Sequence, residues 1–475
     1  MKYIVSIGLE THVQLKTASK MFCGCATSFA AEPNTNVCPV CLGYPGALPQ
    51  LNREAVKLTV LSGLMLGCKI SGHCKFDRKN YFYPDAAKNY QISQLDQPLC
   101  LGGAVEIQTS AGAKTIRLTR IHLEEDVAKS THHPQCSGVD FNRSGLPLME
   151  IVSEPDMASP EEAVAYLRTL RQILVYTGVS DCNLEEGNMR CDVNVSLRPE
   201  GADKLGTKVE LKNMNSFSHI QDALRYEIAR QERAVSCGEA IVQETRRWDL
   251  EAGETASMRT KEDAQDYRYF PEPDLMPIAL PAGQIEEWSK LLPELPAQKR
   301  TRFVEEYQLP EYDAKVLCQQ LAVANFFEQA VSFGAPAKAA SNWIMTDLLR
   351  LLGQTGMDAT EMPLTAEAFA ALLKLVADKT INMPVAKALF DELFEKGGDP
   401  VERVKSRGLG QVSDAGAIDG FARQVVADNP KVVDDFKGGK KQALQYLVGQ
   451  VMKLSRGKAN PTMAAEAIEK AIAQG

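Results

Sequence analysis

The first 290 or so residues are dominated by short segments in which apolar and polar residues alternate, separated by turn-forming residues. The clearest segments are YIVSIGLETHVQL, AVEIQTS, AKTIRLTRIHLEED, RCDVNVSLRP and KVELKN. A period of two places successive side chains on opposite faces of a β-strand, so each segment predicts a strand with one buried face. So many strands in one stretch of chain predict a large antiparallel sheet.

Two longer amphipathic segments interrupt these strands and predict helices. SPEEAVAYLRTLRQILVYTGV begins with Ser159 as N-cap, and Glu162 three residues later completes a capping box. SFSHIQDALRYEIARQERAVSCG begins with Ser216 in the same role. The first part of the chain is therefore an α+β domain.

Prolines cluster after Pro271, in FPEPDLMPIALPAG and LLPELPAQKR, and the pattern beyond them is helical. A chain of 475 residues is long enough for two or three domains, because single cores stop growing at roughly 250–300 residues. We predict three domains, at residues 1–293, 294–405 and 406–475. The last two are helical, and EKGGDP separates them.

Composition excludes several classes of protein. A net charge of −8 argues against a surface coated in nucleic-acid-binding charge, but it permits a local basic patch. No run approaches the ~18 apolar residues of a membrane span. The N-terminus, MKYIVSIGLETH, lacks the apolar stretch of a signal peptide. We therefore expect a cytoplasmic protein, in which the twelve cysteines are reduced.

Four of these cysteines form two closely spaced pairs, Cys23 with Cys25 and Cys38 with Cys41. Two short-spaced pairs across a polar loop bring four thiolates to one tetrahedral ion, and CPVCLG has the form of a metal-binding knuckle. Four protein thiolates leave no position for water, so a zinc site here is structural. Buried apolar cysteines or a thioredoxin-like pair are the alternatives, although no βαβ pattern surrounds the pair.

Carboxylates lie on the polar faces of three predicted strands. Glu10 and His12 share one such face, Asp192 lies on the second and Glu210 on the third. A Glu-x-His pair with further carboxylates is an oxygen-rich set suited to Mg²⁺ or Mn²⁺, whereas a simple solvated face is the alternative. The segment HLEEDVAKS adds Glu124, Glu125 and Asp126, of which only some can face the same site.

A second cluster of charge occupies ETRRWDLEAGETASMRTKEDAQDYRYFPEPD. Its cations suit phosphate oxygens, and a salt-bridged surface is the alternative. The nucleotide-binding patterns G-x-x-x-x-G-K-[ST] and G-x-G-x-x-G and the esterase pattern G-x-S-x-G are absent. Any nucleotide is therefore expected to be held by metals and arginines on a sheet. The candidate phosphate ligands are Arg246, Arg259, Lys261 and Arg268.

One further segment, KFDRKNYFYPDAAKNYQISQLDQPLC, mixes polar and aromatic residues too closely for a core strand. It is rich enough in tyrosine to be more than an ordinary loop. We interpret it as a wall of the site or an interface, with a functionless Ω-loop as the alternative.

The motifs together resemble one known family. IGLETHVQL, KFDRKNYFYPD, YQISQ, LEED, NRSGLPLMEIVSEPD, LEEGNMRCDVNVSLRP, ELKNMNS, QETRRW, DYRYFPEPDL, SNWIM and LVGQVMK follow the order found in the B subunit of bacterial aspartyl/glutamyl-tRNA amidotransferase. The resemblance covers essentially the whole chain. It implies a catalytic cradle similar to glutamine synthetase, followed by a helical domain and a small tail domain.

The resemblance also implies an activity. Such subunits use ATP to phosphorylate the side-chain carboxylate of glutamate on glutamine tRNA or aspartate on asparagine tRNA, and ammonia then displaces phosphate to leave an amide. Phosphorylation turns a poor electrophile into a good one, and Mg²⁺ neutralises the gathering charge. A separate glutaminase A subunit supplies the ammonia, and a small C subunit completes a heterotrimer. A free-standing ligase acting on a small carboxylate, or an RNA-binding scaffold, are the alternatives.

Roles carried over from the family fall on individual residues. The metal and acid set is Glu10, His12, Glu125, Asp192 and Glu210, with Glu125 preferred to Glu124 by resemblance alone. By the same resemblance, Lys79 and Tyr81 are expected to lie where the ammonia passage reaches the site. The tail cations form a local basic surface that suits tRNA phosphates, and a solvated helix face is the alternative. These are Lys437, Lys440, Lys441, Lys453, Arg456 and Lys458.

Overall fold

The computed structural model describes residues 3–184, 186–260, 266–410, 415–438, 440–455, 459 and 461–474. The chain divides into two compact units, Met1–Pro296 and Ala297–Gly475. The first combines a large sheet with helices and the second is helical, which makes the protein α+β. The three predicted domains, with boundaries after residues 293 and 405, stay a prediction. Within the described ranges, no helix has the length and apolar character needed to span a bilayer.

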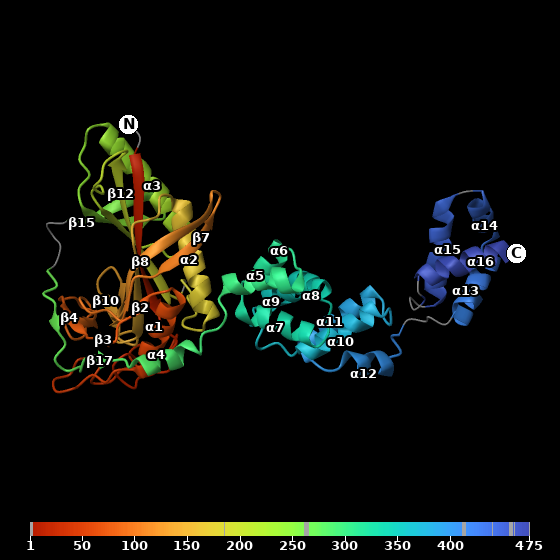
Figure 1. Ribbon diagram of the computed structural model, residues 1–475, viewed down its shortest axis with the longest axis horizontal. Helices are drawn as coiled ribbons and strands as arrows, with labels where there is room; N and C mark the ends of the chain where they lie inside the picture. The colour runs from red at the N-terminus through yellow and green to blue at the C-terminus, as the bar shows by residue number, and fades with distance from the viewer. Residues whose placement is uncertain are drawn as a thin grey trace. The chain divides into compact units, whose positions relative to one another are not determined.

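A ten-stranded sheet forms the body of the first unit (Figure 1). Its strands run in the order β15-β14-β13-β12-β1-β11-β8-β6-β2, with β7 beside β8. Long strands occupy the centre, where β1 pairs with both β12 and β11. The strands are β1 (Tyr3–Gln14), β2 (Lys69–Ile70), β6 (Cys100–Leu101), β7 (Ala104–Thr109), β8 (Gly112–Glu125), β11 (Pro147–Ser153), β12 (Met189–Pro199), β13 (Val209–Lys212), β14 (Glu244–Asp249) and β15 (Glu254–Thr260).

The expectation of a purely antiparallel sheet is wrong at one pair. Strands β13 and β14 run parallel, whereas the other pairs of this sheet among the described residues are antiparallel. The reason is the connection between them, because helix α3 (Phe217–Ser236) carries the chain from one strand to the next. A helical crossover returns the chain in the same direction, whereas a tight hairpin reverses it.

One face of the sheet is apolar and covered by helices. Leu9 and Val13 of β1 are buried there with Val193 of β12. They form one hydrophobic cluster with side chains from α1 (Arg53–Met65), α2 (Pro160–Tyr176) and α3. Because alternate residues point to opposite faces, this burial turns the intervening polar residues to the other face.

The predicted helix starts are confirmed. Ser159 Oγ accepts a hydrogen bond from the Glu162 N–H at 3.2 Å, and Ser216 Oγ accepts one from the His219 N–H at 3.1 Å. The Glu162 carboxylate accepts from the N–H of Ala158 at 2.7 Å, one residue before the position that a standard capping box uses. These caps set where α2 and α3 begin on the sheet.

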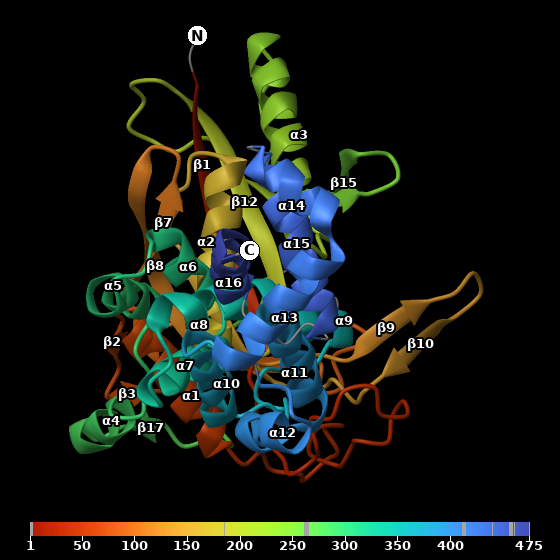
Figure 2. The same cartoon turned by 90° about the vertical axis from the view of Figure 1, so that its right-hand side faces the viewer.

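Smaller elements surround the sheet. Strand β4 (Asp77–Asn80) pairs with both β5 (Tyr90–Ser93) and β16 (Phe270–Pro271), which brings the aromatic segment beside residues 267–271. The hairpin of β9 (Lys129–His132) and β10 (Ser137–Asp140) extends away from the large sheet (Figure 2). The remaining elements of this unit are β3 (His73–Cys74), β17 (Ile278–Ala279) and α4 (Ala282–Ser289).

The second unit contains two separate hydrophobic clusters among its described residues, one within residues 303–404 and one within residues 418–472. Amphipathic helices provide both. They are α5 (Pro296–Tyr307), α6 (Glu311–Leu317), α7 (Leu321–Ser332), α8 (Ala337–Trp343), the π-helical turn η2 (Ile344–Leu348), α9 (Leu349–Thr355), α10 (Ala366–Ala377), α11 (Met383–Lys396), α12 (Pro400–Ser406), α13 (Ala415–Asp428), α14 (Pro430–Lys437), α15 (Lys441–Leu454) and α16 (Pro461–Gln474).

Candidate active site

The central strands bring their polar residues together on the face away from α1, α2 and α3. Strand register places Glu10 opposite Asp192, and His12 opposite Glu150. Glu150 in turn lies opposite His122 on β8. Residues in register on adjacent strands are within side-chain reach. The sheet therefore assembles acids and imidazoles from four strands that are far apart in sequence.

His12 is the centre of this group. Its Nε2 lies 3.3 Å from Glu150 Oε2 and 3.5 Å from Glu124 Oε1. His122 Nε2 approaches the same oxygen of Glu150 at 3.4 Å. One ligand atom from each of His12, Glu124 and Glu150 lies within 4.8 Å of the other two. One imidazole nitrogen and two carboxylate oxygens can hold a hard divalent cation.

The charges of this group stabilise one another. Burial opposes a charge on His12, but the hydrogen bond to Glu150 and the carboxylates of Glu124, Glu150 and Asp192 raise the pKa of His12 to about 9. Burial likewise opposes ionisation of Glu150, but His122 and His12 hold its pKa far below the usual range. The metal-free group therefore contains an imidazolium among carboxylates, and a cation that replaced the proton would meet the same negative field.

The structure differs from the expected choice of Glu125. Glu124 points toward His12, whereas the Glu125 carboxylate pairs with the Lys88 ammonium and accepts from the Ile92 N–H at 2.9 Å. Adjacent strand residues face opposite sides, so the two glutamates cannot both join one cluster. Glu124, and not Glu125, is therefore the glutamate of this pair that faces His12.

Asp192 and Glu210 form a second group around Lys212. The Lys212 ammonium pairs with Asp192 and lies 3.2 Å from Glu210 Oε1. The Thr245 hydroxyl donates to Glu210 Oε2 at 2.7 Å. Burial works against both charges, but the attraction between them lowers the pKa of Glu210 and, together with Asp192, raises that of Lys212. The parallel pairing of β13 and β14 positions this group, because it places Thr245 opposite Glu210.

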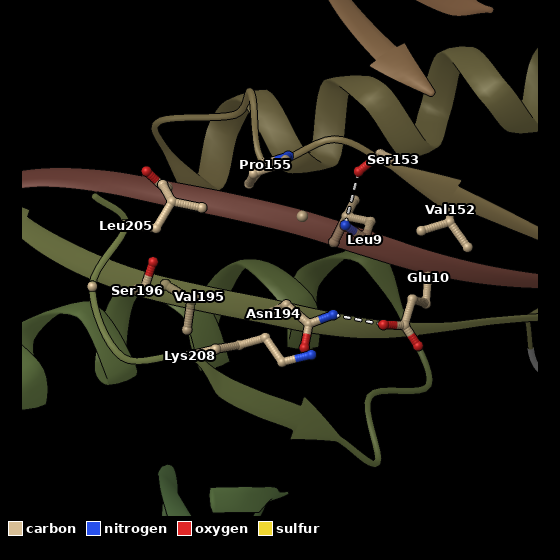
Figure 3. A pocket seen from close by; sticks show the side chains of 13 residues that line it. Leu9, Glu10, Val152, Ser153, Pro155, Asn194, Val195, Ser196, Leu205 and Lys208 are labelled. Atoms are coloured by element: carbon tan, nitrogen blue, oxygen red, sulfur yellow. Dashed lines mark hydrogen bonds between the residues drawn. The ribbon is translucent and has the colours of Figure 1, made fainter. Parts of the chain in front are cut away.

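A cavity of about 200 Å³ adjoins Glu10 on the same strands (Figure 3). Glu10 Oε1 accepts a hydrogen bond from Asn194 Nδ2 at 2.9 Å, and the Lys208 side chain extends toward Asn194. Asn194 Oδ1 is buried and has no partner in the described part of the chain. Val152, Pro155 and Leu205 contribute apolar lining. A small hollow with apolar walls and a few polar groups is suited to part of an organic ligand.

Lys79 lies on β4, with its ammonium 4.9 Å from the centre of the Tyr267 ring. Burial opposes its charge, but Glu124, Tyr269, Tyr267 and Glu150 raise its pKa, so it remains a cation facing the acidic group. Tyr81 packs edge-on against Tyr267, and burial raises the pKa of its hydroxyl. The structure thus brings Lys79 to the electrostatic field of the His12 group.

Of the four candidate phosphate ligands, the structure describes the side chains of Arg246 and Arg268. The Arg246 guanidinium donates to Thr255 Oγ1 at 2.9 Å and Glu244 Oε1 at 2.7 Å, and it lies 3.5 Å from Glu227 Oε2. These contacts give it a role in joining β14, β15 and α3. Arg268 is exposed beyond the end of β15. Of Arg259 only the backbone is described, and Lys261 lies outside the described residues, so phosphate binding by these four stays a prediction.

The four cysteines of the predicted zinc site do converge. One sulfur from each of Cys23, Cys25, Cys38 and Cys41 lies within 4.8 Å of the others, and all four thiols are free. The hydrogen bond from Cys23 lowers the pKa of Cys41 to about 4 against the effect of burial, with help from the Cys38 N–H and the Lys20 ammonium. Burial raises the pKa of Cys25 to about 11. A thiolate set of this kind suits a tetrahedral metal.

The tail cations are partly engaged. Lys437 and Lys453 are exposed at the ends of α14 and α15, whereas Lys440 Nζ lies 2.8 Å from Asp435 Oδ1. Lys441 begins α15 and its side chain is not described, and Arg456 and Lys458 lie outside the described residues. tRNA binding by this surface stays a prediction.

Sequence reasoning missed Glu150, His122 and Lys88, and it gave Lys212 no role. A signal for Glu150 was present, since it interrupts the otherwise apolar strand PLMEIVS. His122 lies on the polar face of β8 and carries the same signal more weakly. For Lys88, which contacts Glu125 from a loop, strand periodicity carries no signal.

Comparison with known proteins places these features in a family. The family model described as GatB/GatE catalytic domain matches residues 5–286, and that described as GatB domain matches residues 325–472. Curated relatives named as the B subunit of aspartyl/glutamyl-tRNA(Asn/Gln) amidotransferase match over nearly full length. Those of Caldanaerobacter subterraneus subsp. tengcongensis and Thermoanaerobacter sp. strain X514 are 52% and 51% identical over 100% of both chains.

A third relative of the same name, from Thermodesulfovibrio yellowstonii, is 51% identical over 99% of this chain and 100% of its own. These matches cover the sheet, the helical residues and the tail. This chain belongs to the family of aspartyl/glutamyl-tRNA(Asn/Gln) amidotransferase B subunits.

Proposed function

We propose that this chain carries the ATP-dependent amidation step of a tRNA-dependent amidotransferase. It phosphorylates the side-chain carboxylate of glutamate on glutamine tRNA, of aspartate on asparagine tRNA, or of both, and ammonia then displaces the phosphate. The observation that supports this most directly is the His12, Glu124 and Glu150 group on the polar face of a sheet. The names of the full-length relatives supply the tRNA substrate and the amide product.

The residues present fit a divalent metal, Mg²⁺ or Mn²⁺. His12, Glu124 and Glu150 would hold it, and Asp192 and Glu210 lie on neighbouring strands where they would complete a second acidic position. Bound there, the metal would neutralise charge on phosphate oxygens during phosphoryl transfer. Glu124 and Glu150 also face the Lys79 ammonium, which adds a fixed positive charge for an anionic substrate.

The cavity beside Glu10 is our candidate for the nucleoside part of ATP. At about 200 Å³ it is smaller than the ~300–1,000 Å³ typical of complete ligand sites, so it would hold only a fragment such as the base. Glu10 lies on the rim and shares β1 with His12 two residues away. A base in the cavity would thus direct its phosphates along β1 toward the metal group.

Glu10 is also our candidate for the proton acceptor. Ammonia that attacks a phosphorylated carboxylate forms a carbon–nitrogen bond, loses a proton and expels phosphate. Glu10 accepts one hydrogen bond, from Asn194, and makes no ion pair among the described residues. Its neighbour Asp192, by contrast, is neutralised by Lys212.

Several finer features belong to the same proposal. The sheet would be a cradle like that of glutamine synthetase, and Lys79 and Tyr81 would lie where ammonia arrives from a glutaminase A subunit, with a C subunit completing a cytoplasmic heterotrimer. Cys23, Cys25, Cys38 and Cys41 would hold structural zinc. The tail lysines would contact tRNA phosphates. The free-standing ligase alternative is not supported, because the full-length relatives are named as subunits.

The test is amidation with ammonium in place of glutamine. Purified chain with its A and C partners, ATP, Mg²⁺ and mischarged tRNA should yield amide on the tRNA. Glu10→Ala should abolish the product, whereas Glu106→Ala, at an exposed position of the same sheet, should leave it unchanged. Amidation that survives Glu10→Ala, or that uses free glutamate as well as charged tRNA, would contradict the proposal.

A further inference from the structure

Lys20 is a buried charge that the proposed reaction does not use. Its side chain is 0% exposed, which is rare for lysine because the ammonium is strongly hydrated. Its Nζ lies 3.6 Å from Cys41 Sγ and 3.3 Å from the carbonyl oxygen of Phe141. Within the described residues it forms no ion pair with a carboxylate. The ammonium therefore points at the cysteine cluster.

A buried ammonium needs an anion. Removing an ion from water costs several kcal/mol unless an opposite charge compensates it. Without a metal, the nearest anion that the cluster offers Lys20 is the single Cys41 thiolate, 3.6 Å from its Nζ. A divalent metal held by four thiolates, in contrast, carries a net charge of about −2, because four negative sulfurs exceed the two positive charges of the ion. Such a centre is a stronger counter-ion for the buried ammonium than a single thiolate.

The surroundings hold Lys20 and Cys41 in one arrangement. The Lys20 N–H donates to the Cys25 carbonyl at 3.0 Å, so the lysine is tied to the first cysteine pair through its backbone. The Ser144 hydroxyl donates to the Cys41 carbonyl at 3.3 Å, which ties the second pair to the loop after β10. A Cβ on Gly145 would lie 3.6 Å from Lys20 Cδ and 3.4 Å from Cys41 Cβ, so both side chains pack next to that glycine.

We propose that Lys20 is the charge partner of the cysteine metal centre, donating an N–H···S hydrogen bond to the Cys41 thiolate. This inference rests on the proposed zinc site. Lys20 acts as a positioning residue, since it orients one ligand and offsets the negative charge of the centre without binding the metal. Groups that hold the ligands of a metal in this way typically change metal affinity by about 10–100-fold when they are removed.

Zinc affinity of the full chain tests the proposal. Lys20→Met keeps the length of the side chain and removes its charge, and Lys16→Met serves as the matched control because Lys16 is exposed and pairs with Asp181. Competition with a chromogenic chelator should show about a 10–100-fold loss of zinc affinity in Lys20→Met and no change in Lys16→Met. Affinity within threefold of wild type in folded Lys20→Met protein would overturn the inference. Wild-type protein that binds no zinc would instead overturn the zinc site itself.

A melting experiment separates charge pairing from packing. In zinc-loaded protein, Lys20→Met should lower Tm, because the tetrathiolate loses its counter-ion. In a Cys41→Ser background with chelator present, the same change should raise Tm, because it removes a buried and uncompensated charge. This second comparison also serves if Lys20→Met alone does not fold. An equal fall in Tm in both backgrounds would mean that Lys20 only fills space, and it would overturn the proposal.

Discussion

Replacing Glu150 with glutamine should lower the pKa of His12 substantially in the metal-free chain. Glu150 Oε2 lies 3.3 Å from His12 Nε2, and its hydrogen bond is the largest influence that raises this pKa. The value of about 9 lies about 2.5 above the model-peptide value, which corresponds to about 3 kcal/mol of favourable interaction with the imidazolium. A neutral amide removes the charge, while the burial that opposes protonation remains. We therefore expect the pKa to fall by at least about 1.

The same shift predicts how stability depends on pH. The pKa of His12 is raised on folding, so its contribution to stability is complete below about pH 6.5 and is lost as the pH rises to about 9. Metal-free wild-type protein should thus lose up to about 3 kcal/mol over this window, and Glu150→Gln should lose much less. Urea unfolding at a series of pH values measures the difference.

Histidine NMR provides the direct assay. The chain has six histidines, so ring signals labelled at Cε1 give a simple spectrum, in which a His12→Asn variant assigns the resonance. Glu161→Gln is the matched control, because that glutamate lies on α2 and pairs with Arg225. Mg²⁺ should displace the His12 proton in wild type, since a ligating imidazole is neutral. A His12 signal that titrates near 6.5, or that does not respond to Glu150→Gln, would refute the reasoning.

Three further predictions concern other contacts. Thr245→Val should lower kcat/KM for ATP about 10–100-fold, because it removes the 2.7 Å hydrogen bond that orients Glu210. Thr245→Ser keeps the hydroxyl and should retain the wild-type kcat/KM. Equal activity of the two variants would contradict this positioning role. Glu227→Gln should lower the free energy of unfolding by about 3–5 kcal/mol, because this 0%-exposed carboxylate accepts hydrogen bonds from Arg230 at 2.7 and 2.9 Å. Urea titration measures the change, and an unchanged unfolding midpoint would refute this prediction. Asp313→Asn should lower the free energy of unfolding at pH 7 by about 1–3 kcal/mol. The pKa of Asp313 is lowered on folding, so the stability that its carboxylate contributes disappears when it is protonated. In thermal melts, the Tm values of the variant and wild type should therefore converge as the pH falls below about 4.

Local sequence pattern was sufficient to predict the strands and turns that depend on a short segment of the chain. The alternation in YIVSIGLETHVQL predicts a strand with Glu10 and His12 on its polar face, and the structure has that strand at Tyr3–Gln14. The spacing of Cys38 and Cys41 predicts a knuckle turn, and Gly43 closes it with a φ of +69°, a conformation open to glycine. Both features depend on residues within a few positions of one another.

Local sequence pattern did not decide which residues form the candidate site. Glu124 and Glu125 differ by one position, and only the pairing of β8 with β11 decides which of them reaches His12. Glu150 joins the group because β11 lies next to β1, although 138 positions separate it from His12. Strand order follows from which apolar faces and crossover helices pack together across the whole unit, and a single strand carries no record of its neighbours.

Sequence shows where charged residues occur, and tertiary structure decides which of them become partners. The residues of ETRRW predict a basic segment, but the crossover through α3 brings Glu227 beside Arg246. Nothing near Lys20 in sequence marks it as buried, and its burial against Cys41 arises only when the cysteine pairs fold onto the loop after β10. Sequence by itself determined the main strands, the helix caps and the close spacing of the cysteine pairs, because backbone periodicity and residue spacing are local properties. Tertiary structure alone decided which charges meet, because that depends on strand order and on the exclusion of water.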